Sequence, residues 1–356
     1  MEKRLKIALV FCFIIAFLVA GFSPARATEK IVWKGQSTWA AGMPILQEGA
    51  EYFAKKVGEL SNGRLIIQMN PAGAIVPAFE LIEAVNKGIV DVACGWASYW
   101  VGKFPASPLF GAVEGGPERM EFLSWVLVGE GLELWQEMYD RANWQVKVLP
   151  PYSAHTSENL AWANKPIRSL ADFRGLKFRT GGLYWGKVLT KMGASVVILP
   201  GGEVIPALQR RVIDAAEWSM PCIDIKMGFH DVCKYLVIPG VHQPSSLDET
   251  LIYKKSWDKL SPDLKSIVWT AARDSSLYIM TREMELNPPA LQFFKEKGIE
   301  VITLPPEVLS KAKALAEEVH NETAARDPFF AKVLSSQRKF QKTWLDYADA
   351  FKIIYK

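Results

Sequence analysis

Cysteine and histidine are scarce in this chain of 356 residues, which has four of each. Cys12 lies in an apolar N-terminal run, so Cys94, Cys222 and Cys233 remain, and an odd number permits at most one disulfide within a chain. Cys222 and Cys233 are the nearer pair in sequence, but we expect buried free thiols. No two histidines stand at metal-pair spacing and no Cys-x-x-Cys occurs, so the sequence contains no zinc motif.

The motifs of common catalytic machineries are also missing. The chain contains no G-x-S-x-G, no H-E-x-x-H and no Walker loop. Residues 181–186, which read GGLYWG, follow a predicted strand but lack the G-x-G-x-x-G spacing of a dinucleotide site. These absences favour a non-catalytic binding protein. A secreted carboxylate-binding sensor or a carboxylate-acting enzyme remains the alternative.

The N-terminus has the three parts of a secretory signal peptide. Basic residues at positions 3, 4 and 6 precede an apolar run over residues 7–21, and Ala25-Arg26-Ala27 forms an A-x-A site. We therefore expect cleavage after Ala27 and a periplasmic mature protein. Without residues 1–27 the chain keeps 38 basic and 37 acidic residues, so its charge does not indicate nucleic-acid binding. No later apolar run is long enough to span a membrane.

One pattern occurs twice in the chain. Residues 80–93 (ELIEAVNKGIVDVA) are echoed by residues 203–216 (EVIPALQRRVIDAA), with Asp91 and Asp214 at matching places. Each copy reads as a short helix, a tight turn and a strand, and each follows a turn of proline and small residues. The repetition predicts two lobes of similar design in an α/β protein, with a cleft between them.

Strand and helix patterns divide the chain further. We predict a signal peptide over residues 1–27, a first lobe mainly from 28–155 and a second lobe mainly from 156–250. Residues 251–356 are predicted to cross back to the first lobe and to add C-terminal helices. Predicted helices cover 44–60, 118–140, 262–287 and 340–354, the third ending at Pro288-Pro289 because proline interrupts helical hydrogen bonding.

The candidate site lies where two predicted strands end. Arg179 closes the strand pattern 176–179, and Glu217-Trp218 closes the pattern 214–217. Open α/β sheets bind ligands at strand ends, and an arginine there can hold a carboxylate through two parallel hydrogen bonds. A glutamate beside it repels an anion unless a cation lies between them. A structural ion pair of Arg179 with Asp172 or Asp214 is the competing interpretation.

Several motifs in order resemble one family along nearly the whole mature chain. They are QSTWAAG (36–42), NPAGAIVPAFELIEAV (70–85), GLKFR (175–179), KMGASVVILPGGEVIPALQ (191–209), VIDAAEW (212–218) and PGVHQP (239–244). The sequence is similar to the substrate-binding proteins of tripartite ATP-independent periplasmic (TRAP) transporters, in the subgroup for 2-oxo acids and lactate-like acids. The resemblance implies a two-lobe periplasmic binding protein fold, type II-like, and partnership with membrane subunits.

The resemblance also implies roles for individual residues. Arg179 would clamp the ligand carboxylate, while the Glu217 side chain and the Trp218 carbonyl would bind a cation, Ca²⁺ or Na⁺, that bridges to the ligand. In the family a glutamine or asparagine upstream of a tryptophan supplies a third ligand. Counting back from Trp162 places Glu158 there, with Asn159 one position away. Glu158 as ligand would favour Ca²⁺, Asn159 would serve after a shift of one residue, and a site without cation is the third possibility.

Aromatic and polar residues near these strand ends complete the candidate site. Trp185 stands where relatives tend to have smaller residues, and with Trp100 it would favour an apolar or aromatic ligand side chain. Relatives in this subgroup form dimers by exchanging a C-terminal helix, so a homodimer and a monomer both remain open. The further lining candidates are Gln36, Trp39, Tyr99 and His242.

Overall fold

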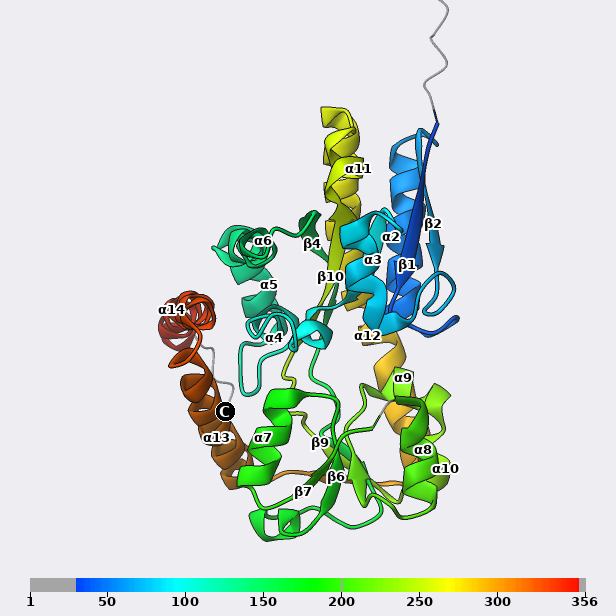
Figure 1. The fold of residues 1–356 in the computed structure, drawn as a ribbon. Helices are drawn as coiled ribbons and strands as arrows, with labels where there is room; N and C mark the ends of the chain where they lie inside the picture. Colours follow the sequence, from blue (N-terminus) through cyan, green and yellow to red (C-terminus); the bar gives the residue numbers. More distant parts are fainter. Residues whose placement is uncertain (1–29, 200, 352–356) are drawn as a thin grey trace, which may run out of the picture.

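Two sheets, each flanked by helices, form two lobes (Figure 1). The computed structural model describes residues 30–199 and 201–351, and the predicted leader with its cleavage site lies outside them. Lobe 1 has the strand order β2-β1-β3-β10-β4, with β10 antiparallel to both neighbours. Its strands are β1 (Ile31–Ser37), β2 (Leu65–Asn70), β3 (Val92–Trp96), β4 (Val146–His155) and β10 (Ser246–Tyr253).

Lobe 2 has a sheet of six short strands in the order β11-β9-β5-β8-β6-β7. Strand β11 belongs here, which differs from the prediction that everything after residue 251 returns to lobe 1 or forms C-terminal helices. The strands are β5 (Ala161–Ala163), β6 (Lys177–Arg179), β7 (Ser195–Val197), β8 (Ala215–Ala216), β9 (Tyr235–Ile238) and β11 (Glu300–Thr303).

The two copies of the repeated sequence fold alike. Asp91 accepts a hydrogen bond from the Lys34 backbone N–H at 2.8 Å, and Asp214 accepts one from the Lys177 backbone N–H at 3.1 Å. In both lobes the aspartate therefore ties the turn after a helix to the neighbouring parallel strand. The helices concerned are α3 (Leu81–Lys87) and α8 (Gly201–Gln209).

Helices of lobe 1 cover its sheet. The helix predicted over 118–140 is two helices, because the backbone of Gly129 is extended and interrupts the helical hydrogen bonds. A side chain does not fit at this break, since a Cβ on residue 129 would lie 2.7 Å from the Trp125 carbonyl oxygen. The elements are α2 (Leu46–Leu60), η1 (Ala78–Glu80), η2 (Ala97–Trp100), α4 (Pro108–Gly111), α5 (Arg119–Val128) and α6 (Gly131–Arg141). Those of lobe 2 are η3 (Leu170–Phe173), α7 (Leu183–Lys191), α9 (Pro221–Met227) and α10 (Phe229–Val232).

A helix of 35 residues, α12 (Pro262–Glu296), follows the short α11 (Lys254–Asp258) and joins the lobes. The prediction that it ends at Pro288-Pro289 was wrong. Both prolines are exposed, so water can solvate the carbonyls that lack a helical partner, and the helix continues into lobe 2. There Phe294 packs edge-on against Trp162, with ring centroids 4.8 Å apart.

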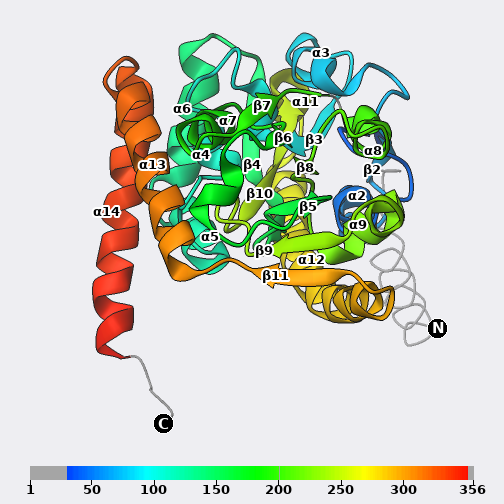
Figure 2. The same cartoon turned by 90° about the horizontal axis from the view of Figure 1, so that it is seen from below.

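The C-terminal helices α13 (Pro306–Ala324) and α14 (Pro328–Ala350) run along one side of the molecule (Figure 2). The last helix was predicted from residue 340, but it begins at Pro328, where the Asp327 side chain accepts hydrogen bonds from two backbone N–H groups. α13 packs on α7 of lobe 2, and α14 packs on α5 and α6 of lobe 1. The pair therefore bridges the lobes outside the main crossings.

The cysteines and the length of the apolar helices were also the subject of predictions. Cys94, Cys222 and Cys233 are all buried free thiols, so a Cys222–Cys233 bridge is not formed. Across residues 30–199 and 201–351, no helix combines the length and apolar character needed to cross a membrane.

Candidate functional site

A cavity of about 450 Å³ lies between the lobes. In lobe 1 its wall comes from residues that follow β1 and β3, and in lobe 2 from residues that follow β6 and β8. The carboxyl ends of parallel strands from both sheets therefore face one space, the usual place for ligand binding in open α/β sheets. The volume lies within the ordinary range of ligand pockets, roughly 300–1,000 Å³.

Arg179 lies at the end of β6 with its guanidinium in the cavity wall and only 6 % of its surface exposed. Its Nε and Nη2 donate to the Leu199 carbonyl at 3.1 and 3.0 Å, and Nη1 donates to the Glu217 carbonyl at 3.1 Å. Arg179 pairs with neither Asp172 nor Asp214, which hold backbone groups elsewhere. These bonds fix the guanidinium plane and use three of its five N–H donors.

Glu217 is buried beside Arg179, with Oε2 3.3 Å from Nη1. Its Oε1 accepts hydrogen bonds from the Thr180 hydroxyl at 2.9 Å and from the Gly181 backbone N–H at 2.5 Å. The neighbouring Trp218 lines the cavity, and its ring lies 5.5 Å from the Arg179 guanidinium carbon. The turn after β6 therefore holds the Glu217 carboxylate in one orientation at the edge of the cavity.

Glu158 and His242 lie next to each other in the cavity wall. Glu158 Oε2 lies 3.5 Å from His242 Nε2, and the two side chains are about nine-tenths buried. Burial raises the pKa of Glu158, with a further rise from the negative charge of Glu217 and an opposing effect from His242. A cation between the two glutamates would remove their mutual repulsion.

Asn159 turns away from the cavity. Its amide donates to Asp224 Oδ2 at 2.8 Å, and the Trp162 indole N–H donates to the same oxygen at 2.6 Å. The Asp224 carboxyl is wholly buried, and burial raises its pKa to about 8. Of the two residues that the sequence left open, Glu158 faces the cavity and Asn159 supports the lobe 2 core.

Gln36 is also a structural residue here and does not line the cavity. Its amide donates to the Val76 carbonyl at 2.8 Å, and its oxygen accepts from the backbone N–H groups of Ile75 and Val76 at 2.7 and 3.0 Å. The side chain therefore fixes the loop after β2 by three hydrogen bonds. The sequence pattern placed it correctly at a strand end but could not give its partners.

The predicted aromatic lining is present in part. Trp39 and Tyr99 line the cavity with ring centroids 5.8 Å apart, and the Trp39 indole N–H donates to the Tyr152 hydroxyl at 2.7 Å. Trp185 lines it too and lies 5.4 Å from the His242 ring. Trp100 does not, since its indole N–H is bonded to Glu249 inside lobe 1.

A buried network missed by sequence reasoning lies where the chain crosses between the lobes. His155, at the end of β4, lies 2.8 Å from Asp248 Oδ2 of β10 and 2.6 Å from Glu283 Oε1 of α12. Glu283 also accepts from Arg119 Nη1 at 2.8 Å. Burial alone would lower the pKa of His155, but the two carboxylates raise it to about 10. Sequence offered no signal for partners 93 and 128 residues away.

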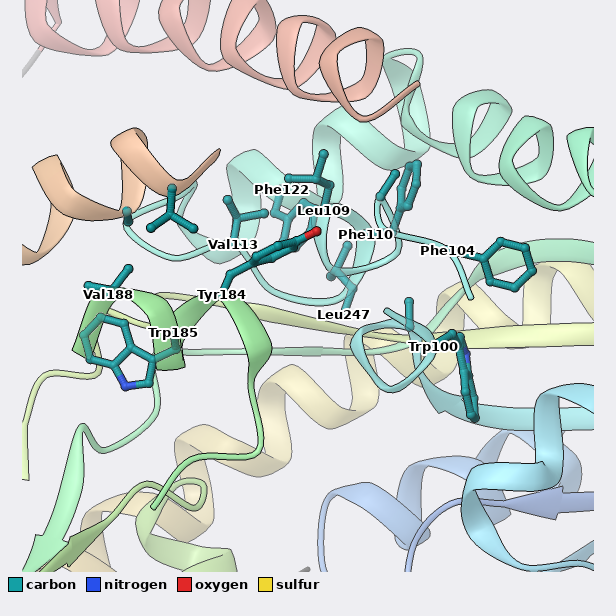
Figure 3. Packing of buried hydrophobic residues seen from close by; sticks show 14 of the residues in the cluster. Trp100, Phe104, Leu109, Phe110, Val113, Phe122, Tyr184, Trp185, Val188 and Leu247 are labelled. Carbon is teal, nitrogen blue, oxygen red and sulfur yellow. The ribbon is translucent and has the colours of Figure 1, made fainter. Parts of the chain in front are cut away.

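Tyr184 makes a contact between the lobes that the sequence did not reveal either. It extends from α7 toward Leu109 and Val113 of lobe 1 (Figure 3), and its hydroxyl donates to the Pro105 carbonyl at 2.8 Å. Its ring also lies 5.7 Å from the Phe330 ring of α14. Burial raises the pKa of Tyr184 to about 12, so the hydroxyl keeps its proton at physiological pH.

The donor set is suited to a hard cation. Glu158 and Glu217 line the cavity with carboxylate side chains, and carboxylate oxygens are ligands that Ca²⁺ and Na⁺ prefer. Within the part of the chain that the structure describes, no three His, Cys, Asp or Glu side chains converge as a complete metal site. A cation held here would therefore need oxygens from the main chain and from the bound molecule.

Comparison with known proteins gives consistent matches along the chain. Residues 36–327 match the model of the family described as bacterial extracellular solute-binding protein, family 7. A monocarboxylate 2-oxoacid-binding periplasmic protein from Nostoc sp. is 32 % identical over 312 residues, which is 87 % of this chain and 84 % of that protein. These matches are to binding proteins rather than to enzymes.

Two solved structures show the same fold. One is a TRAP transporter solute-binding protein from Bordetella bronchiseptica, which is 27 % identical with a TM-score of 0.84. The match covers 90 % of this chain and 95 % of that one. That structure is a mixed-occupancy dimer with calcium and picolinate in one site. A TRAP periplasmic solute-binding protein from Pseudoalteromonas atlantica, with bound sodium and pyruvate, has 29 % identity, a TM-score of 0.83 and coverage of 90 % and 96 %.

Proposed function

Since the chain belongs to the bacterial extracellular solute-binding proteins of family 7, the receptors of TRAP transporters, we propose that it binds a small 2-oxo or 2-hydroxy monocarboxylate. The protein is a solute-binding protein and not an enzyme. One observation carries the proposal: buried Arg179, buried Glu217 and the largely buried side chain of Glu158 line one cavity between two lobes. The binding of 2-oxo acids and pyruvate by similar proteins supports the ligand class.

In this proposal Arg179 holds the ligand carboxylate. The hydrogen bonds to Leu199 and Glu217 pre-orient the guanidinium, so little side-chain freedom is lost when the ligand arrives. A charge-assisted bond in a buried site is strong because water competes with it little. Removal of the guanidinium would leave the acid without its main attraction in a cavity lined by carboxylates.

A cation would complete the site. Glu217, Glu158 and the Trp218 carbonyl are the ligands that we assign to it, and the ligand would add a carboxylate oxygen and its 2-oxygen. Two carboxylates favour Ca²⁺ over Na⁺, because the more highly charged ion gains more from each anionic ligand. Recognition of the 2-oxygen through the cation would explain selectivity against unsubstituted acids.

We propose a periplasmic location after removal of residues 1–27 and delivery of the ligand to the membrane subunits of a TRAP transporter. The periplasmic relatives support the location. Opening and closing of the lobes would admit and release the ligand. A secreted sensor would bind the same acid but would not require transporter subunits.

A homodimer is proposed through helix α14. Its C-terminal half exposes Trp344, Leu345 and Tyr347, Phe351 directly after it is exposed too, and with α5 the helix borders a groove of about 540 Å³. A second copy is the occupant that we assign, because a similar protein was obtained as a dimer. Light scattering of wild type and the Trp344→Ser, Tyr347→Ser variant would test this, and a monomeric wild type would refute it.

Calorimetric titration of residues 28–356 tests the ligand and the cation. We expect pyruvate and lactate to bind in the presence of Ca²⁺, propionate to bind weakly, and a chelator to abolish the difference. Arg179→Ala should abolish binding, and Glu217→Ala should weaken it and remove its dependence on Ca²⁺. Arg168→Ala is the matched control, since Arg168 is exposed and pairs with Glu300 outside the cavity. Unchanged affinity in Arg179→Ala would refute the site.

A further inference from the structure

We infer that the preferred ligand is a 2-oxo acid with a bulky, uncharged, apolar side chain, branched or aromatic, rather than pyruvate. The inference rests on the proposed function and extends it to the part of the cavity that the carboxylate and the cation do not use. Volume, lining and the state of the remaining charged groups carry it.

Volume is the first observation. A cavity of about 150 Å³ is enough for benzene, which has six heavy atoms, as pyruvate does. The cavity between the lobes is about 450 Å³. Pyruvate would therefore leave roughly 300 Å³ for the cation, water and a larger ligand side chain. Filling apolar space with ligand rather than water adds to affinity, so a larger acid fits this cavity better.

The lining of this additional space is the second observation. Away from Arg179 and the two glutamates, the wall is formed mainly by aliphatic, aromatic and thioether side chains from both lobes. The polar atoms of Trp39 and Tyr184 are already bonded to Tyr152 and Pro105, whereas the indole N–H groups of Trp96 and Trp185 have no partner among the described residues and could donate to a ligand. Methionine side chains adapt to ligands of different shape. Apolar members include Met43, Val101, Pro108, Ala112, Leu183 and Met220.

The remaining charges are the third observation. Besides Glu158 and Glu217, the carboxylates in the cavity wall are Glu114 and Asp248. Each is held by a buried histidine at 2.8 Å, Glu114 by His320 of α13 and Asp248 by His155. These carboxylates are thus satisfied within the protein and do not call for a cationic ligand. They would repel a second carboxylate on the ligand, which disfavours dicarboxylic acids.

Two positions in the cavity wall have a backbone that accepts a larger side chain. Ala112 has an extended backbone that any residue adopts, and it lines the lobe 1 wall. Gly182 lines the lobe 2 wall, and a Cβ there would make only ordinary contacts, at 3.6 Å to Trp185 and 3.7 Å to Thr180. Leucine at either place occupies volume that the ligand side chain would use. Gly186→Ala is the control, since it adds a methyl group to α7 outside the cavity.

The test is a set of titrations with Ca²⁺ using pyruvate, 4-methyl-2-oxopentanoate, phenylpyruvate and 2-oxoglutarate. A hydrophobic pocket discriminates by about tenfold or more per methylene group, so we expect the two bulky acids to bind about 100-fold more tightly than pyruvate. Ala112→Leu and Gly182→Leu should lose this preference and keep pyruvate binding, while Gly186→Ala behaves as wild type. Melting curves without ligand confirm that each variant is folded.

The outcomes separate this inference from the proposed function. If pyruvate binds as tightly as the bulky acids, or if 2-oxoglutarate binds best, the side-chain preference is wrong and the 2-oxo acid receptor stands. If the preference survives in both leucine variants, the side chain does not occupy this space and the inference is again overturned. If none of the four acids binds, the proposed function fails and this inference fails with it.

Discussion

Replacement of His155 by glutamine would measure the contribution of one buried proton to stability. Asp248 and Glu283 raise the pKa of His155 to about 10 against the effect of burial, while the ordinary value is 6.5. Because the folded pKa is the higher one, the stabilisation is complete below about pH 6.5. It is lost as the pH rises toward 10.

The magnitude follows from the difference between the two pKa values. Within that range the folded state holds one more proton than the unfolded state, so the free energy of unfolding falls by about 1.4 kcal/mol per pH unit. Between about pH 7 and about pH 8.5 the fall is roughly 2 kcal/mol. The whole contribution in acid is about 5 kcal/mol. His155→Gln should lack this part of the slope.

Urea unfolding at a series of pH values, followed by tryptophan fluorescence, gives the slope of the free energy of unfolding against pH for wild type and each variant. The buried thiols also have raised pKa values because of burial, but they are common to all variants and cancel in the comparison. In His155→Gln the carboxylates of Asp248 and Glu283 lose the cation between them and repel each other. The double variant His155→Gln, Asp248→Asn removes one of the two charges and therefore this repulsion. Equal slopes in wild type and both variants would refute a protonated His155.

Three further predictions concern single positions. Burial raises the pKa of Glu158, so ligand affinity with Ca²⁺ should fall as acid protonates it, and titrations of Glu158→Gln should show a smaller fall on acidification than wild type. An equal fall in both proteins would contradict this. Tyr184→Phe removes the hydrogen bond from the Tyr184 hydroxyl to the Pro105 carbonyl, which is worth about 1 kcal/mol. The affinity for the 2-oxo acid should therefore weaken about fivefold, and small-angle X-ray scattering should show a more open ligand-free protein. An unchanged Kd would contradict this prediction. Gly129→Ala should destabilise by about 1–3 kcal/mol in urea unfolding, whereas Gly58→Ala in α2, which meets only an ordinary contact, should not.

Sequence patterns located the elements that are specified locally. Arg179 ends strand β6 and Glu217 directly follows strand β8. Both places could be predicted because a short apolar run followed by a polar residue is a local pattern that needs no tertiary information. The repeated aspartate predicted two similar units, and Asp91 and Asp214 make equivalent backbone contacts. The start of α14 was missed: Asp327 followed by Pro328 is a helix-start signal, but the prediction began this helix only at residue 340.

Other features could not be predicted from the sequence, because they depend on which way a side chain points or on residues far away in the chain. Adjacent residues in extended chain point to opposite sides, so counting alone could not decide between Glu158 and Asn159. The continuation of α12 through Pro288 depends on packing in lobe 2. Gln36 and His155 are fixed by groups far along the chain, and no local pattern encodes those contacts.

The proline pair in α12 provides the receptor with an elastic element. Any opening of the lobes must bend this helix, because it is anchored in both of them. Bending is easiest where Pro288 and Pro289 leave two carbonyls without a helical partner. If the lobes open as proposed, this proline pair is therefore where α12 would yield first. Both prolines lie outside the cavity, so a hinge at this place would be separate from the residues that contact the ligand.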